Sequence, residues 1–299
     1  MGKIYKNLVF EGNGAIGVAY CGAIKALEEK GLRKNVQRVC GTSSGSIMSL
    51  LVSLNLPASD IEHTYMDLNF KKVLDGGLTG IYRLVTQFGF FKGDHLENMC
   101  REKIAGVLGN PHATFRDFHR SKKCLPLSVI VCNLSKGKSE VFSYETTPDF
   151  EVAKAVRMSF SIPFVFAQKK YLNDYYTDGG IIRAYGIEYF DNLDKKNGLN
   201  INKSETLGFY LDQRDTFETD KVKGIVGFSK ALAYIVTVYQ QYDDLLRTES
   251  NKKRTVFIDS LGIFPFDFNL SNEKKSWLIT QGYNDTMNYL NTSKKLKVA

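Results

Sequence analysis

The first residue that could take part in a chemical reaction is a serine in a short segment between two glycines. Residues 41–45 read GTSSG, which matches the pattern G-x-S-x-G. In hydrolases with this pattern the serine occupies a strained turn between a strand and a helix, and glycines let the backbones approach closely. Ser43 has Gly41 and Gly45 two residues away on either side, whereas Ser44 lacks such neighbours. Ser43 is therefore the candidate nucleophile, and the competing interpretation is a serine that only caps the next helix.

A glycine-rich segment precedes this serine by one predicted strand and helix. Gly12, Gly14 and Gly17 form the pattern G-x-G-x-x-G between an apolar run at 3–10 and a helical pattern at 18–31. Backbone N–H groups in such a turn bind negative charge, either a phosphate or a developing oxyanion. A dinucleotide site also needs an acidic residue roughly 20 residues further on. The second predicted strand, 36–40, leads into GTSSG instead, so an oxyanion loop is favoured over a nucleotide-binding oxidoreductase.

A serine nucleophile needs a base. None of the four histidines follows a strand or lies in a glycine turn, so a carboxylate is the better candidate. Two Asp-Gly-Gly sequences offer one, at Asp75 and at Asp178 with Gly179 and Gly180. Asp75 lies in a loop-like stretch, where Asp-Gly is ordinarily a turn. Asp178 follows an alternating aromatic and apolar segment, which predicts that it emerges at the end of a strand.

The elements that must position these residues indicate one α/β domain. The predicted strands and helices include a helix at 46–54, strands at 200–212 and 254–259, and a long amphipathic helix at 224–247. That helix packs either on the sheet, which we favour, or on an activating partner. The 299 residues contain no Pro-, Ser- or Gly-rich linker, so residues 1–299 are expected to form a single domain. With 43% hydrophobic and 24% charged residues, disordered and collagen-like classes are excluded.

The composition also limits where the protein is expected to act and which partners it is expected to bind. No stretch of about 18 residues is free of charge, so no membrane span is expected. No signal peptide is visible, so the amino terminus is interpreted as that of a mature protein, and delivery to another compartment stays open. The five cysteines lack C-x-x-C spacing, which favours free thiols in a reducing, cytoplasmic setting. The net charge of +8 is spread over lysine pairs and favours solubility first and anionic lipid second. Nucleic acid has only this charge in its favour and is not expected as a partner.

Several segments, in order, resemble the patatin-like phospholipase family. The segment LVFEGNGAIGVAYCGAIKALEEKGL is similar to the family's glycine-rich loop and first helix, and VCGTSSGSIMSLLVSL is similar to its nucleophile turn. TFRDF, AVRMSFSIPFVF and TDGG resemble the segments that lead to its aspartate, and FDFNLSNEKKSWLITQGYNDTMNYL resembles its closing helix. Three motifs in the right order make this resemblance specific.

The resemblance implies a three-layer α/β/α fold with a mostly parallel central sheet and a Ser–Asp dyad that cleaves acyl esters of lipids. Ser43 would be the nucleophile and Asp178 the base that takes its proton. The N–H groups of Gly12, Asn13 and Gly14 would form the oxyanion hole. The other motif glycines are Gly17, Gly41, Gly45, Gly179 and Gly180. The resemblance implies phospholipase A or lysophospholipase chemistry on phospholipid or another acyl-ester lipid. The four histidines form no metal-ligand pattern and the sequence contains no calcium loop, so neither a metal ion nor a cofactor is expected.

The chain departs from the family pattern at two positions of the loop. Asn13 stands where most members have a third consecutive glycine, and Ile16 stands where they have a basic residue. We expect Asn13 to tolerate a left-handed backbone, and we expect the loss of the basic residue to weaken the potential beside the oxyanion. The alternative to an active hydrolase is therefore a weak or inactive member that binds lipid or a protein partner, or that waits for a protein activator.

Lipid substrate has to leave a bilayer, which predicts an apolar rim near the site. The segment IYRLVTQFGFFK at 81–92 is the best candidate, as a mobile lid of aromatic side chains with lysines facing anionic head groups. The residues concerned are Phe88, Phe90 and Phe91, with Lys71, Lys72 and Lys92. The protein would then be peripheral at membranes. The competing interpretation is an ordinary buried helix and turn.

Overall fold

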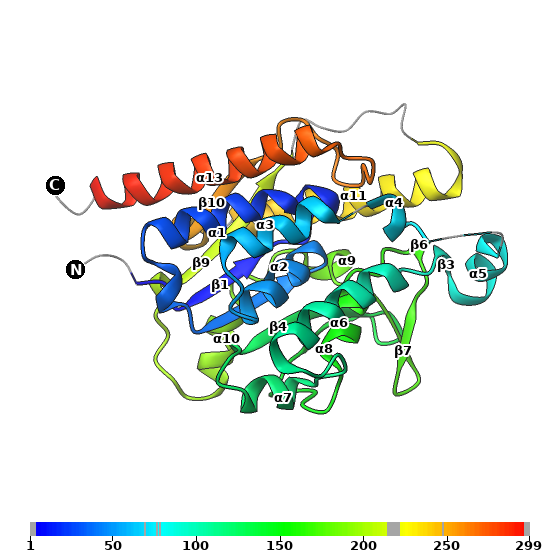
Figure 1. Cartoon of the computed structure of the whole chain (residues 1–299), viewed down its shortest axis with the longest axis horizontal. Helices are drawn as coiled ribbons and strands as arrows, with labels where there is room; N and C mark the ends of the chain where they lie inside the picture. The colour runs from blue at the N-terminus through cyan, green and yellow to red at the C-terminus, as the bar shows by residue number, and fades with distance from the viewer. Residues whose placement is uncertain are drawn as a thin grey trace.

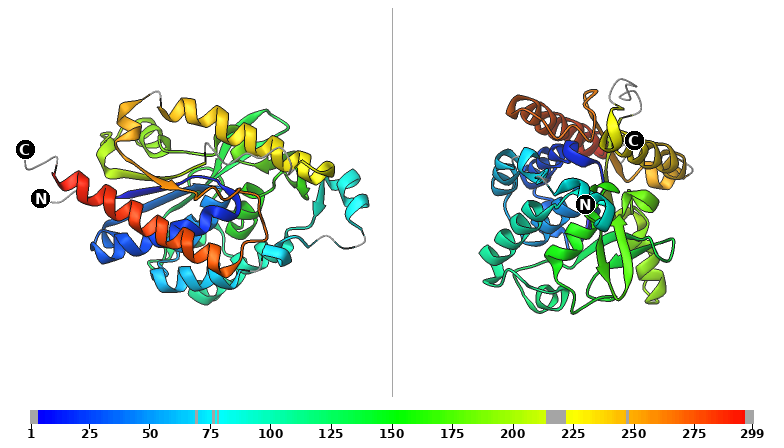
Figure 2. Two further views of the ribbon diagram at one scale, coloured as in Figure 1. Left: turned by 90° about the horizontal axis from the view of Figure 1, so that it is seen from above. Right: turned by 90° about the vertical axis from the view of Figure 1, so that its right-hand side faces the viewer.

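A central sheet with helices on both faces forms the body of the molecule (Figures 1 and 2). The structure, a computed structural model, describes residues 4–68, 70–75, 77, 79–213, 222–246 and 248–295. Its eight-stranded sheet has the order β10-β9-β1-β2-β4-β8-β7, with β5 paired to β4. The first five strands of this order are mutually parallel, whereas β5, β7 and β8 join by antiparallel pairing. The predicted α/β fold with a mostly parallel sheet is therefore confirmed.

The strands of this sheet are β1 (Asn7–Phe10), β2 (Arg38–Thr42), β4 (Leu127–Asn133), β5 (Lys138–Phe142), β7 (Lys169–Tyr171), β8 (Asp174–Asp178), β9 (Thr206–Asp212) and β10 (Thr255–Asp259). Two short strands, β3 (Gly89–Phe91) and β6 (Phe164–Phe166), pair separately. The predicted strands at 3–10, 36–40, 200–212 and 254–259 correspond to β1, β2, β9 and β10. The parallel strands are short and almost wholly buried because helices cover both faces.

The helices divide between the two faces. The α-helices are α1 (Tyr20–Glu29), α2 (Ser44–Ser53), α3 (Ala58–Asp67), α4 (Phe70–Val73), α5 (Gly80–Gln87), α6 (Asp94–Leu108), α7 (Phe115–Arg120), α8 (Val152–Ser159), α9 (Gly180–Arg183), α10 (Tyr189–Lys196), α11 (Gly224–Leu246), α12 (Glu249–Lys252) and α13 (Asn272–Lys295). Three 3-10 helices are η1 (Gly14–Ala19), η2 (Arg33–Asn35) and η3 (Lys203–Glu205). The helix predicted at 18–31 is thus split into η1 and α1.

Alternation along β1 explains how the sheet separates two cores. Leu8 and Phe10 belong to the larger hydrophobic cluster, whereas Val9 belongs to a smaller one with Tyr210 and Phe190. Successive side chains of a strand point to opposite faces, so one apolar run serves both layers. All five cysteines are buried and free. Within the described ranges, no helix combines the length and apolar character that a bilayer crossing requires.

Candidate active site

The turn between β2 and α2 holds Ser43 in a strained conformation. Its φ of 49° and ψ of −123° lie outside the regions that side chains other than glycine favour. A Cβ on Gly41 would collide with the backbone of Gly45, and a Cβ on Gly45 would collide with the backbone of β1 at Phe10. These contacts explain both flanking glycines. The capping interpretation is wrong for Ser43, because its side chain makes no cap hydrogen bond to α2.

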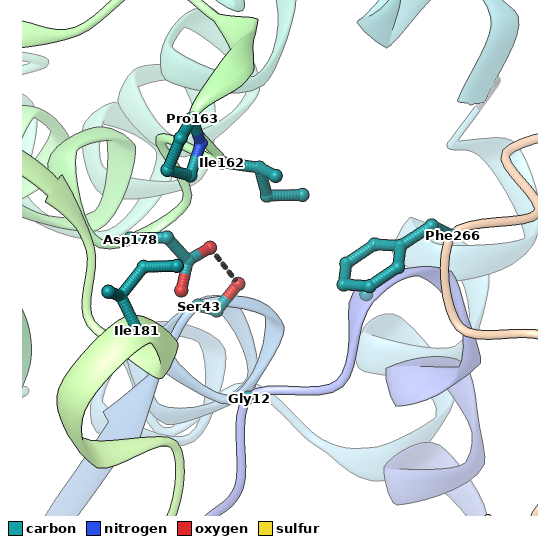
Figure 3. Close-up of a pocket in the computed structure, with 8 residues that line it drawn as sticks. Gly12, Ser43, Ile162, Pro163, Asp178, Ile181 and Phe266 are labelled. Atoms are coloured by element: carbon teal, nitrogen blue, oxygen red, sulfur yellow. Dashed lines mark hydrogen bonds between the residues drawn. The ribbon is translucent and has the colours of Figure 1, made fainter. Parts of the chain in front are cut away.

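The hydroxyl of Ser43 instead points to Asp178. Ser43 Oγ donates to Asp178 Oδ2 at 2.7 Å (Figure 3), and Asp178 Oδ1 accepts the N–H of Gly180 at 2.8 Å. The register of the sheet brings these two residues together, because Thr42 pairs with Ile130 on one side of β4 and Asp178 pairs with Val131 on the other.

Burial gives this carboxyl group an unusual affinity for a proton. Asp178 is only 6% exposed. Desolvation raises the pKa of Asp178, and the hydrogen bonds from the Ser43 hydroxyl and the Gly180 N–H lower it. Desolvation is the larger effect, so the pKa is raised to about 7. A carboxylate with a pKa near neutrality, in direct hydrogen bond with a hydroxyl, can act as a general base.

Ser159 supports the turn from the end of α8. Its hydroxyl accepts the N–H of Ser43 at 2.7 Å and donates to the carbonyl oxygen of Ile130 at 2.6 Å. Ser159 is fully buried. Sequence reasoning did not single it out, and its place in the segment AVRMSFSIPFVF was the only available signal.

The glycine-rich loop lies beside Ser43, but most of its amides already have acceptors. The N–H of Gly12 donates to the carbonyl oxygen of Ala184 at 2.9 Å, and the N–H of Asn13 donates to Ser44 Oγ at 2.9 Å. The next amide, of Ala15, donates to Pro265 at 2.7 Å. Only Gly14, of the three expected oxyanion donors, has an N–H without an acceptor in the described part of the chain.

The two departures from the family pattern have structural explanations. The tolerance of Asn13 for a left-handed backbone is not needed here, because its φ is −147° and the left-handed residue is Gly14 with a φ of 55°. The Asn13 side chain donates to Glu11 Oε2 at 3.3 Å and to the carbonyl oxygen of Leu211 at 3.2 Å, which joins the loop to the end of β9. Ile16 is completely buried in the larger core.

Ser43 and Asp178 line a narrow, mostly apolar cavity. Figure 3 shows Ile181 beside Asp178, and Phe266 across from the two side chains. The remaining lining residues are Gly12, Gly14, Ile162 and Pro163. The cavity holds about 10 Å³, the room of roughly one water molecule. An acyl chain can enter only if part of this wall moves.

The second Asp-Gly-Gly sequence has a different position and role. Asp75 accepts the N–H of Gly93 at 2.5 Å and of Asp94 at 2.9 Å, so it satisfies donors at the start of α6. Gly76 lies outside the described residues. Within the described ranges, no group of three or more His, Cys, Asp or Glu side chains is arranged to hold a metal ion.

The segment expected to form an aromatic lid is divided between exposed and packed residues. Phe88 is exposed, whereas Phe90 and Phe91 are half-buried in β3, which pairs with β6. The ring of Phe91 packs against the core residue Phe166 at 6.3 Å. Phe90 and Phe91 are therefore held in β3 rather than on a free lid, and contact of this segment with lipid stays a prediction. The side chain of Lys71 is not among those that the structure describes.

Together, the layered sheet and the serine at its strand–helix turn define an α/β protein with a candidate hydrolase site. The family model described as patatin-like phospholipase matches residues 8–191. This match spans more than half of the chain, which therefore belongs to the patatin-like phospholipase family. The expectation that residues 1–299 form one domain stays a prediction.

Individual relatives agree with this family. A probable lipid hydrolase of Invertebrate iridescent virus 6 is 31% identical over 204 residues, covering 65% of this chain and 67% of the viral protein. The uncharacterized protein YqhO of Bacillus subtilis is 27% identical over 306 residues, 96% of this chain and 98% of its own length. Calcium-independent phospholipase A2-gamma of Homo sapiens is 22% identical over 60% of this chain, but that match covers only 25% of the human protein.

Solved structures share the fold. VipD from Legionella pneumophila matches 96% of this chain and 67% of its own with a TM-score of 0.65 at 19% identity. ExoU from Pseudomonas aeruginosa, solved in complex with SpcU, matches 97% of this chain and 52% of its own with a TM-score of 0.56 at 19% identity. At such identities the likeness concerns the fold alone.

Proposed function

We propose that this protein is a lipid acyl hydrolase of the phospholipase A or lysophospholipase type, with Ser43 as nucleophile and Asp178 as general base. The observation that carries the proposal is the 2.7 Å hydrogen bond from Ser43 Oγ to a buried Asp178 at a strained strand–helix turn. Family membership and a viral relative called a probable lipid hydrolase support the choice of lipid esters.

In the first half of the reaction Asp178 Oδ2 takes the hydroxyl proton as Ser43 Oγ attacks the ester carbonyl carbon. The carbonyl oxygen becomes the oxyanion of a tetrahedral intermediate, and the Gly14 N–H is the loop donor available to it. The alcohol then leaves with the proton from Asp178, and the acyl group stays on Ser43. The Gly12 and Asn13 amides serve as further donors only if they release Ala184 and Ser44.

In the second half a water molecule attacks the acyl carbon while Asp178 accepts one of its protons. Collapse of the new tetrahedral intermediate breaks the bond to Ser43 Oγ, which recovers a proton from Asp178. A free fatty acid leaves, and the dyad returns to its starting state. No histidine and no cofactor takes part in either step.

The apolar lining favours an acyl group over a polar one. Ile162, Pro163, Ile181 and Phe266 line the cavity that also contains Ser43, and this environment matches a hydrocarbon chain next to an ester.

A catalytically weak or inactive lipid- or partner-binding protein is the second candidate. Two observations favour it: the room for about one water molecule, and the engagement of the Gly12 and Asn13 amides. An activator that opens the wall would reconcile this candidate with the first.

The test is fatty-acid release from phosphatidylcholine and lysophosphatidylcholine in mixed micelles by the purified protein. Wild type should release fatty acid, and Ser43→Ala should abolish the release. Ser49→Ala is the matched control, because Ser49 is also buried on α2 and its hydroxyl has no hydrogen-bond partner among the described residues. Equal release by wild type and Ser43→Ala would refute the dyad, and no release by wild type would favour the second candidate.

A further inference from the structure

Helix α5 presents its apolar side to solvent. Ile81, Tyr82 and Val85 are 72%, 71% and 71% exposed, although large apolar side chains ordinarily face the core. Ile81 and Val85 are four residues apart and share one face. Phe88 lies just beyond the helix in a left-handed conformation; its side chain is 43% exposed and its ring contacts Tyr175 at 5.5 Å. We call Ile81, Tyr82, Val85 and Phe88 the α5 face.

A buried arginine holds the helix in this orientation. Arg83 is 5% exposed, and its guanidinium donates to the carbonyl oxygen of Phe90 at 2.5 Å and to Thr79 Oγ1 at 2.8 Å. Arg83 is thus the residue of α5 that is turned inward, and its hydrogen bonds fix the helix to β3 and to its own N-cap residue, Thr79, whereas Thr86 and Gln87 are exposed. The outward position of the apolar side is therefore a built feature of the fold.

The α5 face lies at the end of the molecule that holds the serine cavity. Figures 1 and 2 show α5 projecting beyond the body of the protein, next to β3 and β6. The carbonyl oxygen of Phe88 accepts the N–H of Phe164, whose side chain is exposed and whose neighbour Pro163 lines the cavity. Ile182, the neighbour of the lining residue Ile181, is exposed as well. Exposed apolar side chains therefore extend from α5 towards the cavity.

A cationic cavity of about 400 Å³ adjoins this face. Tyr82, Arg83, Lys92 and Lys169 line it together with one carboxylate, Asp94. Lys169 is balanced by Glu97 at 3.3 Å and by Asp94 at 3.9 Å. Lys92 is exposed and forms no ion pair within the described residues, so its charge is available to a ligand.

Apolar side chains that project beside an exposed cation, Lys92, match one kind of partner. At a bilayer surface the apolar groups enter the acyl region while the cations stay at the level of the lipid phosphates. A protein partner would use the apolar stripe but has no particular need for the unpaired Lys92. The net charge of +8 also favours an anionic surface.

We propose that the α5 face and its adjoining cationic cavity dock this protein on anionic phospholipid bilayers, with Ile81, Val85 and Phe88 inserted and Lys92 at the phosphates. This docking would place the serine cavity close to the lipid. It does not depend on the proposed hydrolysis, because binding can be measured in protein that lacks the Ser43 hydroxyl.

The test is co-sedimentation of Ser43→Ala protein with vesicles of phosphatidylcholine alone or mixed with phosphatidylglycerol. We expect binding to the mixed vesicles, weakened about tenfold or more by the double change Ile81→Ser and Val85→Ser. Leu199→Ser is the matched control, because Leu199 is 59% exposed but precedes β9, at the amino ends of the parallel strands. It should leave binding unchanged.

The charge is tested by Lys92→Glu, which should weaken binding to mixed vesicles about tenfold and make it less dependent on salt. Lys34→Glu is its control, since Lys34 is also exposed but precedes β2 and so lies at the amino ends of the parallel strands, whereas Ser43 lies at their carboxyl ends. Thermal melts verify that each variant is folded.

Three results would overturn the proposal. The first is that the double change Ile81→Ser and Val85→Ser leaves vesicle binding equal to that of the Ser43→Ala protein. The second is that Lys92→Glu and Lys34→Glu weaken vesicle binding equally. The third is a dimer in light scattering that the double change converts to monomer, because the face would then bind a second copy of this chain.

Discussion

Replacing Asp178 by asparagine should lower activity strongly and, at the same time, stabilise the fold above neutral pH. Burial raises the pKa of Asp178 from 3.8 to about 7. The folded protein therefore holds this proton up to about pH 7, whereas the unfolded chain loses it near pH 4. Between these values the folded state binds more protons, so stability falls as the pH rises. At about 1.36 kcal/mol per pH unit, the ionised carboxylate costs the fold about 4 kcal/mol at pH 8.

Asparagine carries no charge at any pH and keeps an oxygen for the Gly180 N–H. Asp178→Asn should therefore raise the melting temperature by several degrees at pH 8, and the gain should vanish towards pH 4. Activity should fall by about 10²-fold or more, because the general base is lost.

The assay is calorimetry at pH 4 to 8 together with initial rates on a soluble ester. Asp75→Asn is the matched control: its carboxylate accepts N–H groups at the start of α6, so its loss should lower the melting temperature. The same change should leave activity in place. A melting temperature of Asp178→Asn equal to or below that of wild type at pH 8 would refute the electrostatic reasoning.

Three further outcomes follow from the geometry. Asp178 must be ionised to accept a proton, and its pKa is about 7. The value of kcat/KM on a short soluble ester should therefore rise about tenfold per pH unit below this pKa and level off above it. A flat profile from pH 5 to 8 would contradict a base of this kind. Phe266→Ala removes one wall of the cavity, so kcat/KM for an octanoyl ester should rise relative to that for an acetyl ester. The free energy of unfolding should fall by about 3 kcal/mol, because Phe266 is buried. An unchanged ratio of the two kcat/KM values would show that Phe266 does not limit the access of long acyl chains to Ser43. Gly41→Ala should prevent folding, because the added Cβ would collide with the backbone of Gly45. Gly106→Ala is the control: its Cβ would meet no atom within 4 Å, so the change should stabilise α6 slightly. A soluble Gly41→Ala protein with a native-like circular dichroism spectrum would contradict the prediction.

The turn around Ser43 could be predicted because its determinants are local. A short apolar strand, two glycines and an apolar helix lie within about 20 residues, and each of these features of a nucleophile turn can be recognised in the amino-acid sequence. The pairing with Asp178, 135 residues away, depended on sheet register and on the family resemblance. The prediction placed Asp178 at a strand end. It gave no hint that β8 runs antiparallel to β4, which brings Asp178 level with Val131.

The donors of the glycine-rich loop could not be assigned from sequence. Which amides are free depends on Ala184 and Pro265, whose carbonyl oxygens approach from distant segments. The conformation of Asn13 likewise depends on Glu11 and Leu211, and Leu211 lies on another strand. The orientation of α5 was hidden for the same reason, because periodicity reveals an apolar face but not the neighbour that it meets.

The reactivity of the Ser43 hydroxyl is tested most directly by a fluorophosphonate probe followed by intact-mass and peptide mass spectrometry. One adduct per chain is predicted, on Ser43, formed faster at pH 8 than at pH 5 and absent from Ser43→Ala protein. Labelling of Ser44 instead, or an equal adduct on the Ser43→Ala protein, would contradict a nucleophile at this turn.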